Sequence, residues 1–265
     1  MALKIGLIGI VGEEMKKDPW GTLGQVAKLG YQGVEGAGGV AARTGIDPAE
    51  FKTKLAELGL DPIAQGLRLH AGEPDATPSI TAAKALGCKY VIQYWGPCES
   101  AEQLKTWAKT LDSVGKQCRD AGLTFCYHNH NHEFAKFGGK YGLDILMENT
   151  DPSHVAVELD VAWVTYGGAD PVEMILKYAG RCPVLHMKDL AAVPAGGLTG
   201  NDGSQGRGET QFTEVGTGVV DIAGVVAAAR DCGVEWLVVE QDRMNKLAPM
   251  DSIRVSYENL KRIVG

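Results

Sequence analysis

Three histidines stand close together at the end of one apolar segment. His128, His130 and His132 follow residues 123–127 at intervals of two, and Glu133 comes directly after them. Alternate side chains of an extended segment point to the same face, so His128 and His130 are expected to share one side of a strand. A buried strand that delivers imidazoles at its carboxyl end suits metal binding or acid–base chemistry. The alternative is a polar loop whose histidines only hydrogen-bond to their neighbours.

Three later apolar segments also end in groups that can bind a metal. Asp160, His186 and Glu240 lie at or near the ends of these segments. If the segments are parallel strands, their carboxyl ends meet at one edge of the sheet and bring the side chains together. Two imidazoles and two carboxylates form a mixed site suited to Mn²⁺, Co²⁺, Zn²⁺ or Mg²⁺. We therefore predict a divalent-metal site made of His128, Asp160, His186 and Glu240; the alternative is that each group only meets solvent at a strand end.

The elements that must position these groups alternate between apolar runs and helical segments. Eight such units of about 30 residues each predict a parallel sheet covered by helices. This count and size are typical of a (β/α)₈ TIM barrel, here an α/β single domain over residues 1–265. A doubly wound sheet is the competitor, but no strand is followed by a Gly-x-Gly-x-x-Gly turn. The expected strands are 4–10, 33–36, 61–69, 90–95, 123–127, 155–160, 184–189 and 236–242.

Composition narrows the class of protein. The 265 residues carry a net charge of −7 with a sequence pI near 5.4, which argues against a nucleic-acid partner. The first apolar run is too short for a signal peptide or a membrane span. Six cysteines without a Cys-x-x-Cys pair predict reduced core thiols, with Cys126 on the histidine face as a small buried side chain. We expect a cytoplasmic protein with no membrane partner; barrels often dimerise, so a homo-oligomer stays an open expectation.

Six motifs, in this order, resemble the xylose isomerase-like TIM barrels. That family includes sugar phosphate isomerases/epimerases, inosose dehydratase and, more distantly, endonuclease IV. The set extends over essentially the whole chain and is more specific for the family than for the reaction. The motifs occupy residues 127–134, 158–163, 168–171, 186–189, 215–218 and 239–242.

The resemblance implies a metal held by side chains that end strands five to eight. It places three ligands on Asp160, His186 and Glu240, whereas the acidic residue expected on strand five is replaced by His128, or by His130 if the register slips by two. Three carboxylates would leave the site with a net charge of about −1, but two carboxylates and two neutral imidazoles leave it near zero and make the metal a stronger Lewis acid. This histidine resembles the dehydratase and keto-sugar branches of the family more than its symmetrical epimerases.

The resemblance implies a sugar or sugar phosphate isomerase or epimerase that transfers a proton next to a carbonyl. An inosose dehydratase-like lyase or hydratase, in which the same enolate expels a hydroxyl, is the alternative. Glu240 is the candidate base, with Glu133 nearby, and His130 or His132 is the candidate proton shuttle. Lys188 is a candidate for stabilising an enediolate, with a structural ion pair to Asp189 or Glu240 as the alternative.

Other side chains are candidates for contact with a sugar or polyol substrate. His70 ends strand three, and Trp95 and Trp163 could offer apolar faces to a sugar ring or simply pack. Arg207 could bind a phosphate or hydroxyl, with a solvated loop charge as the alternative. It lies in the Gly-rich segment 191–210, a candidate lid or a plain surface excursion.

Two further groups of residues bear on the remaining hypotheses. Glu158 lies two residues before Asp160 and is expected as a hydrogen-bonded acid of the barrel core. A metal-dependent nuclease would need a basic groove and additional ligands that the acidic chain does not offer. A sugar-binding barrel without catalysis is the other competitor, and it predicts that Glu240→Gln leaves ligand binding unchanged.

Overall fold

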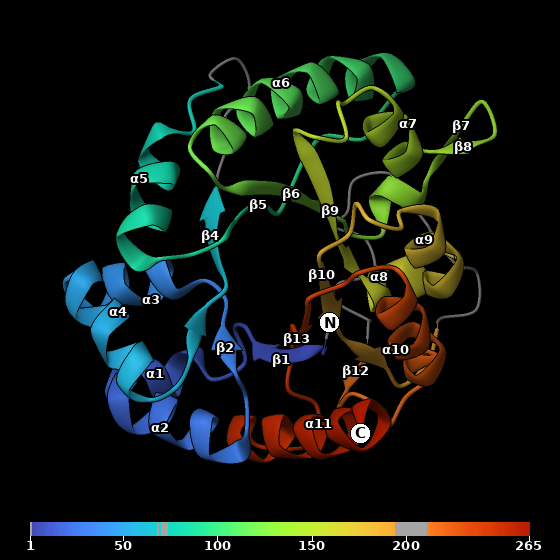
Figure 1. Cartoon of the computed structure of the whole chain (residues 1–265). Helices are drawn as coiled ribbons and strands as arrows, with labels where there is room; N and C mark the ends of the chain where they lie inside the picture. The colour runs from blue at the N-terminus through green and yellow to red at the C-terminus, as the bar shows by residue number, and fades with distance from the viewer. Residues whose placement is uncertain (1, 68, 70–73, 194–210) are drawn as a thin grey trace.

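Parallel strands form a closed ring in the computed structural model, which describes residues 2–67, 69, 74–193 and 211–265. The order in the sheet is β3-β2-β1-β13-β10-β9-β6-β5-β4. Figure 1 shows these strands around a central axis with helices outside them. Their bounds are β1 (Lys4–Leu7), β2 (Gly33–Val34), β3 (Asp61–Pro62), β4 (Ala64–Leu67), β5 (Tyr90–Gln93), β6 (Thr124–His128), β9 (Val155–Asp160), β10 (Val184–Met187) and β13 (Trp236–Val239).

The ring closes because β3 and β4 are two parts of one extended stretch. Ile63 lies between them, and its N–H donates to the carbonyl of Val34 at 2.9 Å. Its own carbonyl accepts from Tyr90 N–H at 3.3 Å on the other side. One residue therefore bridges both neighbouring strands, and eight strand positions surround the axis. The predicted TIM barrel is confirmed.

The helices cover the outside of the barrel (Figure 1). Several begin where the sequence provides a cap: Asp47 accepts hydrogen bonds from Ala49 and Glu50 N–H, and Ser100 accepts one from Gln103 N–H. The helices are α1 (Gly12–Lys17), α2 (Pro19–Leu29), α3 (Ala37–Thr44), α4 (Pro48–Glu57), α5 (Thr77–Leu86), α6 (Ala101–Asp120), α7 (Gly142–Glu148), α8 (Val161–Tyr166), α9 (Pro171–Lys177), α10 (Ile222–Asp231) and α11 (Pro249–Val264).

Short elements that the apolar pattern does not predict lie close to the carboxyl end of the barrel. Helix α8 follows β9 without a loop because the Asp160 side chain accepts from Trp163 N–H at 2.9 Å. A 3₁₀ turn (His132–Phe134) follows β6. Two small hairpins are made by β7 (Lys136–Phe137) with β8 (Lys140–Tyr141), and by β11 (Asp189–Leu190) with β12 (Phe212–Thr213).

The apolar core has two parts separated by the sheet. The larger part lies between strands and helices, and the smaller part fills the barrel, where Cys126, Val184 and Val238 pack together. Cys126 is fully buried, and burial raises the pKa of its thiol well above the usual value. The expectation of a small buried side chain at this position agrees with its packing.

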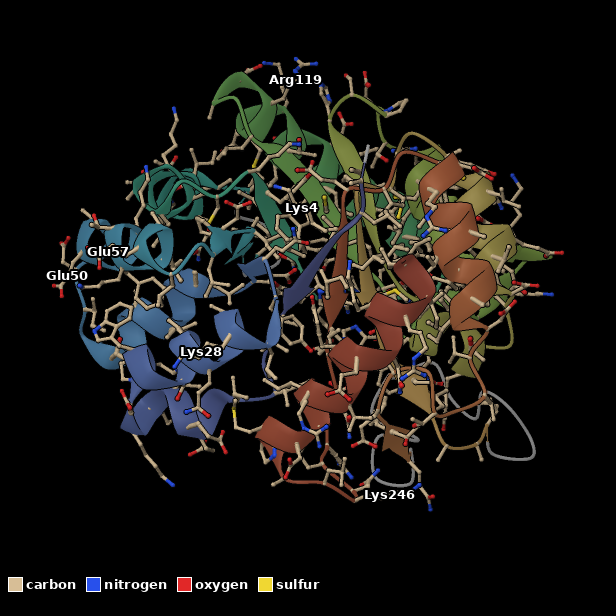
Figure 2. The ribbon with its side chains drawn as sticks, turned by 60° about the horizontal axis from the view of Figure 1, so that its bottom comes forward. Lys4, Lys28, Glu50, Glu57, Arg119 and Lys246 are labelled. Carbon is tan, nitrogen blue, oxygen red and sulfur yellow. The ribbon has the colours of Figure 1, made fainter. Side chains whose placement is uncertain are left out.

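Charged side chains gather on the outside of the helical layer. Figure 2 shows Glu50, Glu57 and Arg119 at the outer edge of the molecule. Among the described residues, no helix combines the length and the apolar character that crossing a bilayer requires.

Candidate functional site

The inward faces of the late strands change from apolar to ionisable toward their carboxyl ends. In β9, Ala156 is followed at intervals of two by Glu158 and Asp160, all on one face. In β10, Val184 is followed in the same way by His186, and the register places His186 beside Asp160. The sequence therefore builds an apolar floor and sets the polar groups above it at the mouth of the barrel.

Four predicted metal ligands meet at this mouth. His128, Asp160, His186 and Glu240 each offer a donor atom, and these atoms all lie within 4.8 Å of one another. The first three side chains are buried, and Glu240 is partly exposed. His186 Nδ1 lies 2.9 Å from Glu240 Oε2. We call these residues the four-donor cluster.

Lys188 extends into the same cluster and is almost completely buried. Its ammonium lies 2.9 Å from Asp160 Oδ2, 2.8 Å from Glu240 Oε2 and 2.8 Å from Asp242 Oδ2. Burial would lower the pKa of Lys188, but the three carboxylates outweigh it and hold the pKa well above its usual value. The side chain is therefore a fixed positive charge at neutral pH.

The structural partners expected for Lys188 are found only in part. The ion pair with Glu240 is present, whereas Asp189 turns away and accepts backbone hydrogen bonds from Gly216, Gly218 and Val220. Asp189 thereby anchors the segment after β12. The third carboxylate around Lys188, Asp242, was not singled out from the sequence, although its spacing of two from Glu240 was a usable signal.

The charges of the four-donor cluster depend on one another. Burial raises the pKa of Asp160, while the charge of Lys188 offsets part of that rise. For Glu240 burial acts in the same direction, but Lys188 and His186 outweigh it and hold the pKa well below its usual value. Burial, together with His186 and His130, lowers the pKa of His128 well below its ordinary value, so this imidazole is neutral.

A second group of acids lies next to His186. Its Nε2 is 3.1 Å from Glu35 Oε1 and 3.3 Å from Glu158 Oε2, and Glu158 Oε2 also lies 3.0 Å from His128 Nδ1. Tyr94 O–H donates to Glu35 at 2.6 Å. Burial and the neighbouring Glu35 raise the pKa of Glu158 well above its usual value. Glu158 thus lies where a hydrogen-bonded core acid was expected and orients both imidazoles.

Glu35 and Tyr94 were not singled out by sequence reasoning. Glu35 follows directly after β2, in a short strand flanked by glycines, and is 4% exposed. Burial raises the pKa of Tyr94 well above its usual value, and Glu35 adds to the shift. The available signal was an acid directly after a short buried strand. Its role becomes clear only from its contacts with His186 and Tyr94, which are distant in the sequence.

His130 and His132, which follow β6, form an aromatic wall beside the four-donor cluster. The His130 ring lies 5.0 Å from that of His128 and 5.0 Å from that of Trp95, but His130 is not one of the four convergent donors. The His132 ring is 4.2 Å from Trp95, and its Nε2 lies 3.0 Å from the carbonyl of Gly96. The geometry therefore favours His128 over His130 as the ligand from β6.

The two tryptophans lie in different surroundings. Trp95 is 40% exposed, whereas Trp163 is 1% exposed and packs with its ring 5.4 Å from Phe212. Lys188 Nζ lies 5.5 Å from the Trp163 ring. The Trp95 ring is therefore accessible from solvent, whereas the buried Trp163 ring packs against the Lys188 cation.

Glu133 lies away from the convergent donors. It is fully buried, accepts from Tyr127 O–H at 2.6 Å and from His130 N–H at 2.9 Å, and lies 3.2 Å from His132 Nε2. These contacts hold the turn after β6 in place. The candidate substrate contacts His70 and Arg207 lie outside the described residues, as does segment 194–210 of the candidate lid.

Comparisons with known proteins agree with this architecture. The model of the xylose isomerase-like TIM barrel family matches residues 23–263. Inosose dehydratase from Geobacillus kaustophilus is 26% identical over an alignment of 275 positions, which covers 91% of this chain and 86% of that protein. A sugar phosphate isomerase/epimerase from Parabacteroides distasonis has a crystal structure with a TM-score of 0.78 at 22% identity, covering 100% of this chain and 96% of that one. The IolI protein, crystallised with a zinc atom, has a TM-score of 0.72 at 16% identity, covering 99% and 98% of the two chains.

Proposed function

This chain belongs to the xylose isomerase-like TIM barrel family, and we propose that it is a metal-dependent isomerase or epimerase of a sugar or sugar phosphate. The observation that carries the proposal is the convergence of His128, Asp160, His186 and Glu240 at the carboxyl end of the barrel. Active sites of TIM barrels are built at this end. A proton transfer next to a carbonyl is the reaction that these groups support.

The donor set fits a divalent cation. It combines two imidazoles with two carboxylates, a mixture suited to Mn²⁺, Co²⁺, Zn²⁺ or Mg²⁺. Asp160 Oδ2 is buried and, although close to Lys188, receives no hydrogen bond of good geometry among the described residues. When bound, a divalent cation supplies Lewis acidity that acidifies the C–H beside a coordinated carbonyl.

Glu240 is the group to which we assign proton abstraction. Its lowered pKa keeps the carboxylate ionised at neutral pH, and it is the partly exposed member of the four-donor cluster. His130 lies beside the cluster with its ring 5.0 Å from Trp95 and is the candidate for returning the proton. Trp95 would cover one face of the sugar. We assign Glu133 a positioning role because its hydrogen bonds hold the turn that carries His130.

Lys188 is suited to stabilising negative charge on a substrate oxygen. Its ammonium is held in place by three carboxylates and needs no rearrangement as charge develops. Its single positive charge also offsets part of the negative charge of those carboxylates before a substrate arrives. A preorganised cation of this kind favours an enediolate over the ground-state carbonyl.

A lyase of inosose dehydratase type is an equally supported reaction. The similarity to inosose dehydratase extends over 91% of this chain, and an imidazole, His128, stands where family epimerases have an acid. Both reactions begin with removal of the same proton. In the lyase, the enolate would then expel a neighbouring hydroxyl.

The experiment that separates the two reactions follows product mass. Purified protein is analysed for bound metal and then incubated with keto-sugars and inososes, before and after removal of the metal. A product that has lost water identifies the lyase, and a product of unchanged mass with altered configuration identifies the isomerase. Absence of bound metal together with full turnover after chelation would contradict the metal-dependent proposal.

A further inference from the structure

A cavity of about 620 Å³ lies beside Glu35, the acid that contacts His186 of the four-donor cluster. It is lined by the segments that follow β1 and β2, by β4 and by residues of the helices α1 to α5. Figure 1 shows these elements together on one side of the barrel. Cavities of this size bind small organic molecules in other proteins.

Part of the cavity lining is polar and includes a side chain that contacts the four-donor cluster. Glu35 lines it, and the same side chain lies 3.1 Å from His186 Nε2. Tyr94 and Gln65 line it as well. Within the described part of the chain, Glu35 Oε2 and Gln65 Oε1 are buried without a hydrogen-bond partner. A buried polar atom without a partner is costly, so this end is suited to a ligand that donates hydrogen bonds, as a sugar hydroxyl does.

Much of the remaining lining is apolar, although Arg43 and Ser79 belong to it as well. Three of its side chains keep some accessible surface, and we call them the apolar pocket: Val11, Met15 and Val40. Leu23, Val26 and Phe51 also belong to the lining but have no accessible surface. Hydroxyl groups placed here would lose their hydrogen bonds with water and gain none. These apolar side chains offer nothing to a phosphate, and the cation of the cavity lining, Arg43 on α3, is an exposed residue. An aromatic or alkyl group, in contrast, would gain from burial.

Two glycines help to leave this space open. A Cβ atom at Gly9 or at Gly12 would meet nothing within 4 Å. Gly9 has a φ of +75°, which favours glycine on backbone grounds alone. Gly12 is the first residue of α1, and its backbone conformation does not require glycine. A larger residue there could extend into the cavity without a change of the backbone.

We propose that the apolar pocket binds an aromatic or alkyl substituent attached to the sugar that reacts at the four-donor cluster. The preferred substrate class is then a glycoside-like keto-sugar with an apolar group, rather than a free sugar. This inference rests on the proposed function. Because Glu35 both lines the cavity and contacts His186, one molecule could place its sugar near the four-donor cluster and its substituent in the apolar pocket.

The test compares two unreactive probes, phenyl β-D-glucopyranoside and methyl β-D-glucopyranoside, by calorimetric titration of the metal-loaded protein. Burial of the phenyl ring is expected to make the phenyl probe bind at least about tenfold more tightly than the methyl probe. Gly12→Leu places a side chain in the apolar pocket and is expected to bring the ratio of the two affinities close to one. Gly24→Leu is the matched control on α2, since a Cβ there meets only Leu58 at 3.9 Å, and the ratio is expected to stay at its wild-type value.

A measurement on the unmodified protein guards against a misfolded variant. The methyl resonance of Met15 is expected to shift on addition of the phenyl probe and to remain unchanged with the methyl probe. Equal affinities for the two probes, no binding of the phenyl probe, or an unmoved Met15 resonance would overturn the inference. Turnover of free keto-sugars without any preference for the phenyl probe overturns only the inference that the apolar pocket binds a substituent. A phenyl preference without turnover of any keto-sugar contradicts the proposed function instead.

Discussion

Lysine–carboxylate pairs occur at both ends of the barrel, but in opposite surroundings. At the amino end, Lys4 on β1 lies 2.9 Å from Asp61 on β3, and the two side chains are 39% and 59% exposed. At the carboxyl end, Lys188 lies at similar distances from three carboxylates and is 1% exposed. The same chemical pair is therefore solvated at one end and buried at the other.

The difference in burial determines what each pair contributes. Exposed ion pairs contribute about 0–1 kcal/mol, because water already solvates both partners. Buried charges lose that solvation and depend on one another, so a missing partner is costly. A protein gains little stability from such a buried group over a well-packed apolar core. Its occurrence at the end where TIM barrels place their active sites fits a catalytic purpose.

The largest expected effect follows from Lys188→Met. This change leaves Asp160, Glu240 and Asp242 together without their cation, and breaking a buried ion pair costs about 3–5 kcal/mol. Denaturant unfolding is expected to show a loss of that order, and turnover is expected to disappear. Lys4→Met is the matched control at the amino end, with an expected change of less than about 1 kcal/mol. Similar losses of unfolding free energy for the two variants would contradict the claim that the ion pairs at the two ends of the barrel contribute differently.

A second variant tests the buried end with less damage to the fold. Asp160→Asn keeps the oxygen that accepts from Trp163 N–H, so α8 retains its cap. The other oxygen is replaced by an NH₂ group that faces Lys188 and cannot bind a cation. Bound metal and turnover are expected to fall by at least about 100-fold, measured by elemental analysis and by the keto-sugar assay. Full metal content in a folded variant would exclude Asp160 as a ligand.

The smallest expected effect concerns pH dependence at the amino end. Glu235 accepts from Tyr90 O–H at 2.8 Å and pairs with Lys89. Burial would raise the pKa of Glu235, but Lys89 and Tyr90 outweigh it and lower the pKa below its ordinary value of 4.5. The stabilisation is therefore present above pH 4.5 and is lost as the pH falls through the lowered pKa.

Glu235→Gln makes that prediction measurable. The variant is expected to be less stable than the wild type by about 1 kcal/mol at neutral pH, in urea unfolding. The difference is expected to shrink below pH 4.5, because the wild-type carboxylate then becomes protonated. A difference that persists or grows in acid would contradict the lowered pKa.

The fold and the family followed from patterns within the sequence. Apolar runs alternating with helices predict the barrel, because each strand–helix unit is local in the chain. His128, Asp160, His186 and Glu240 could be placed at one mouth because parallel strands share their carboxyl ends. The resemblance to xylose isomerase-like TIM barrels is confirmed by the match over residues 23–263.

Details that depend on contacts between distant strands did not follow from the sequence. Glu35 meets His186 across 151 positions of the chain, and no local pattern encodes that contact. Of the three carboxylates around Lys188, only Glu240 was expected from the sequence, whereas the contacts with Asp160 and Asp242 were not. Helices α1, α3 and α8 were not predicted because they are short and their apolar spacing is weak over so few residues.

The measurement that tests the central claim most directly is hydrogen exchange at carbon. Keto-sugars are incubated in D₂O with the metal-loaded protein, and NMR follows the C–H next to the carbonyl. Isomerisation and dehydration both begin with loss of this proton. We therefore expect either deuterium at that carbon or a product that has lost water. Neither result is expected with Glu240→Gln. Unaltered C–H signals for every keto-sugar and inosose in the screen, with the metal bound, would contradict the assignment of proton-transfer chemistry to this site.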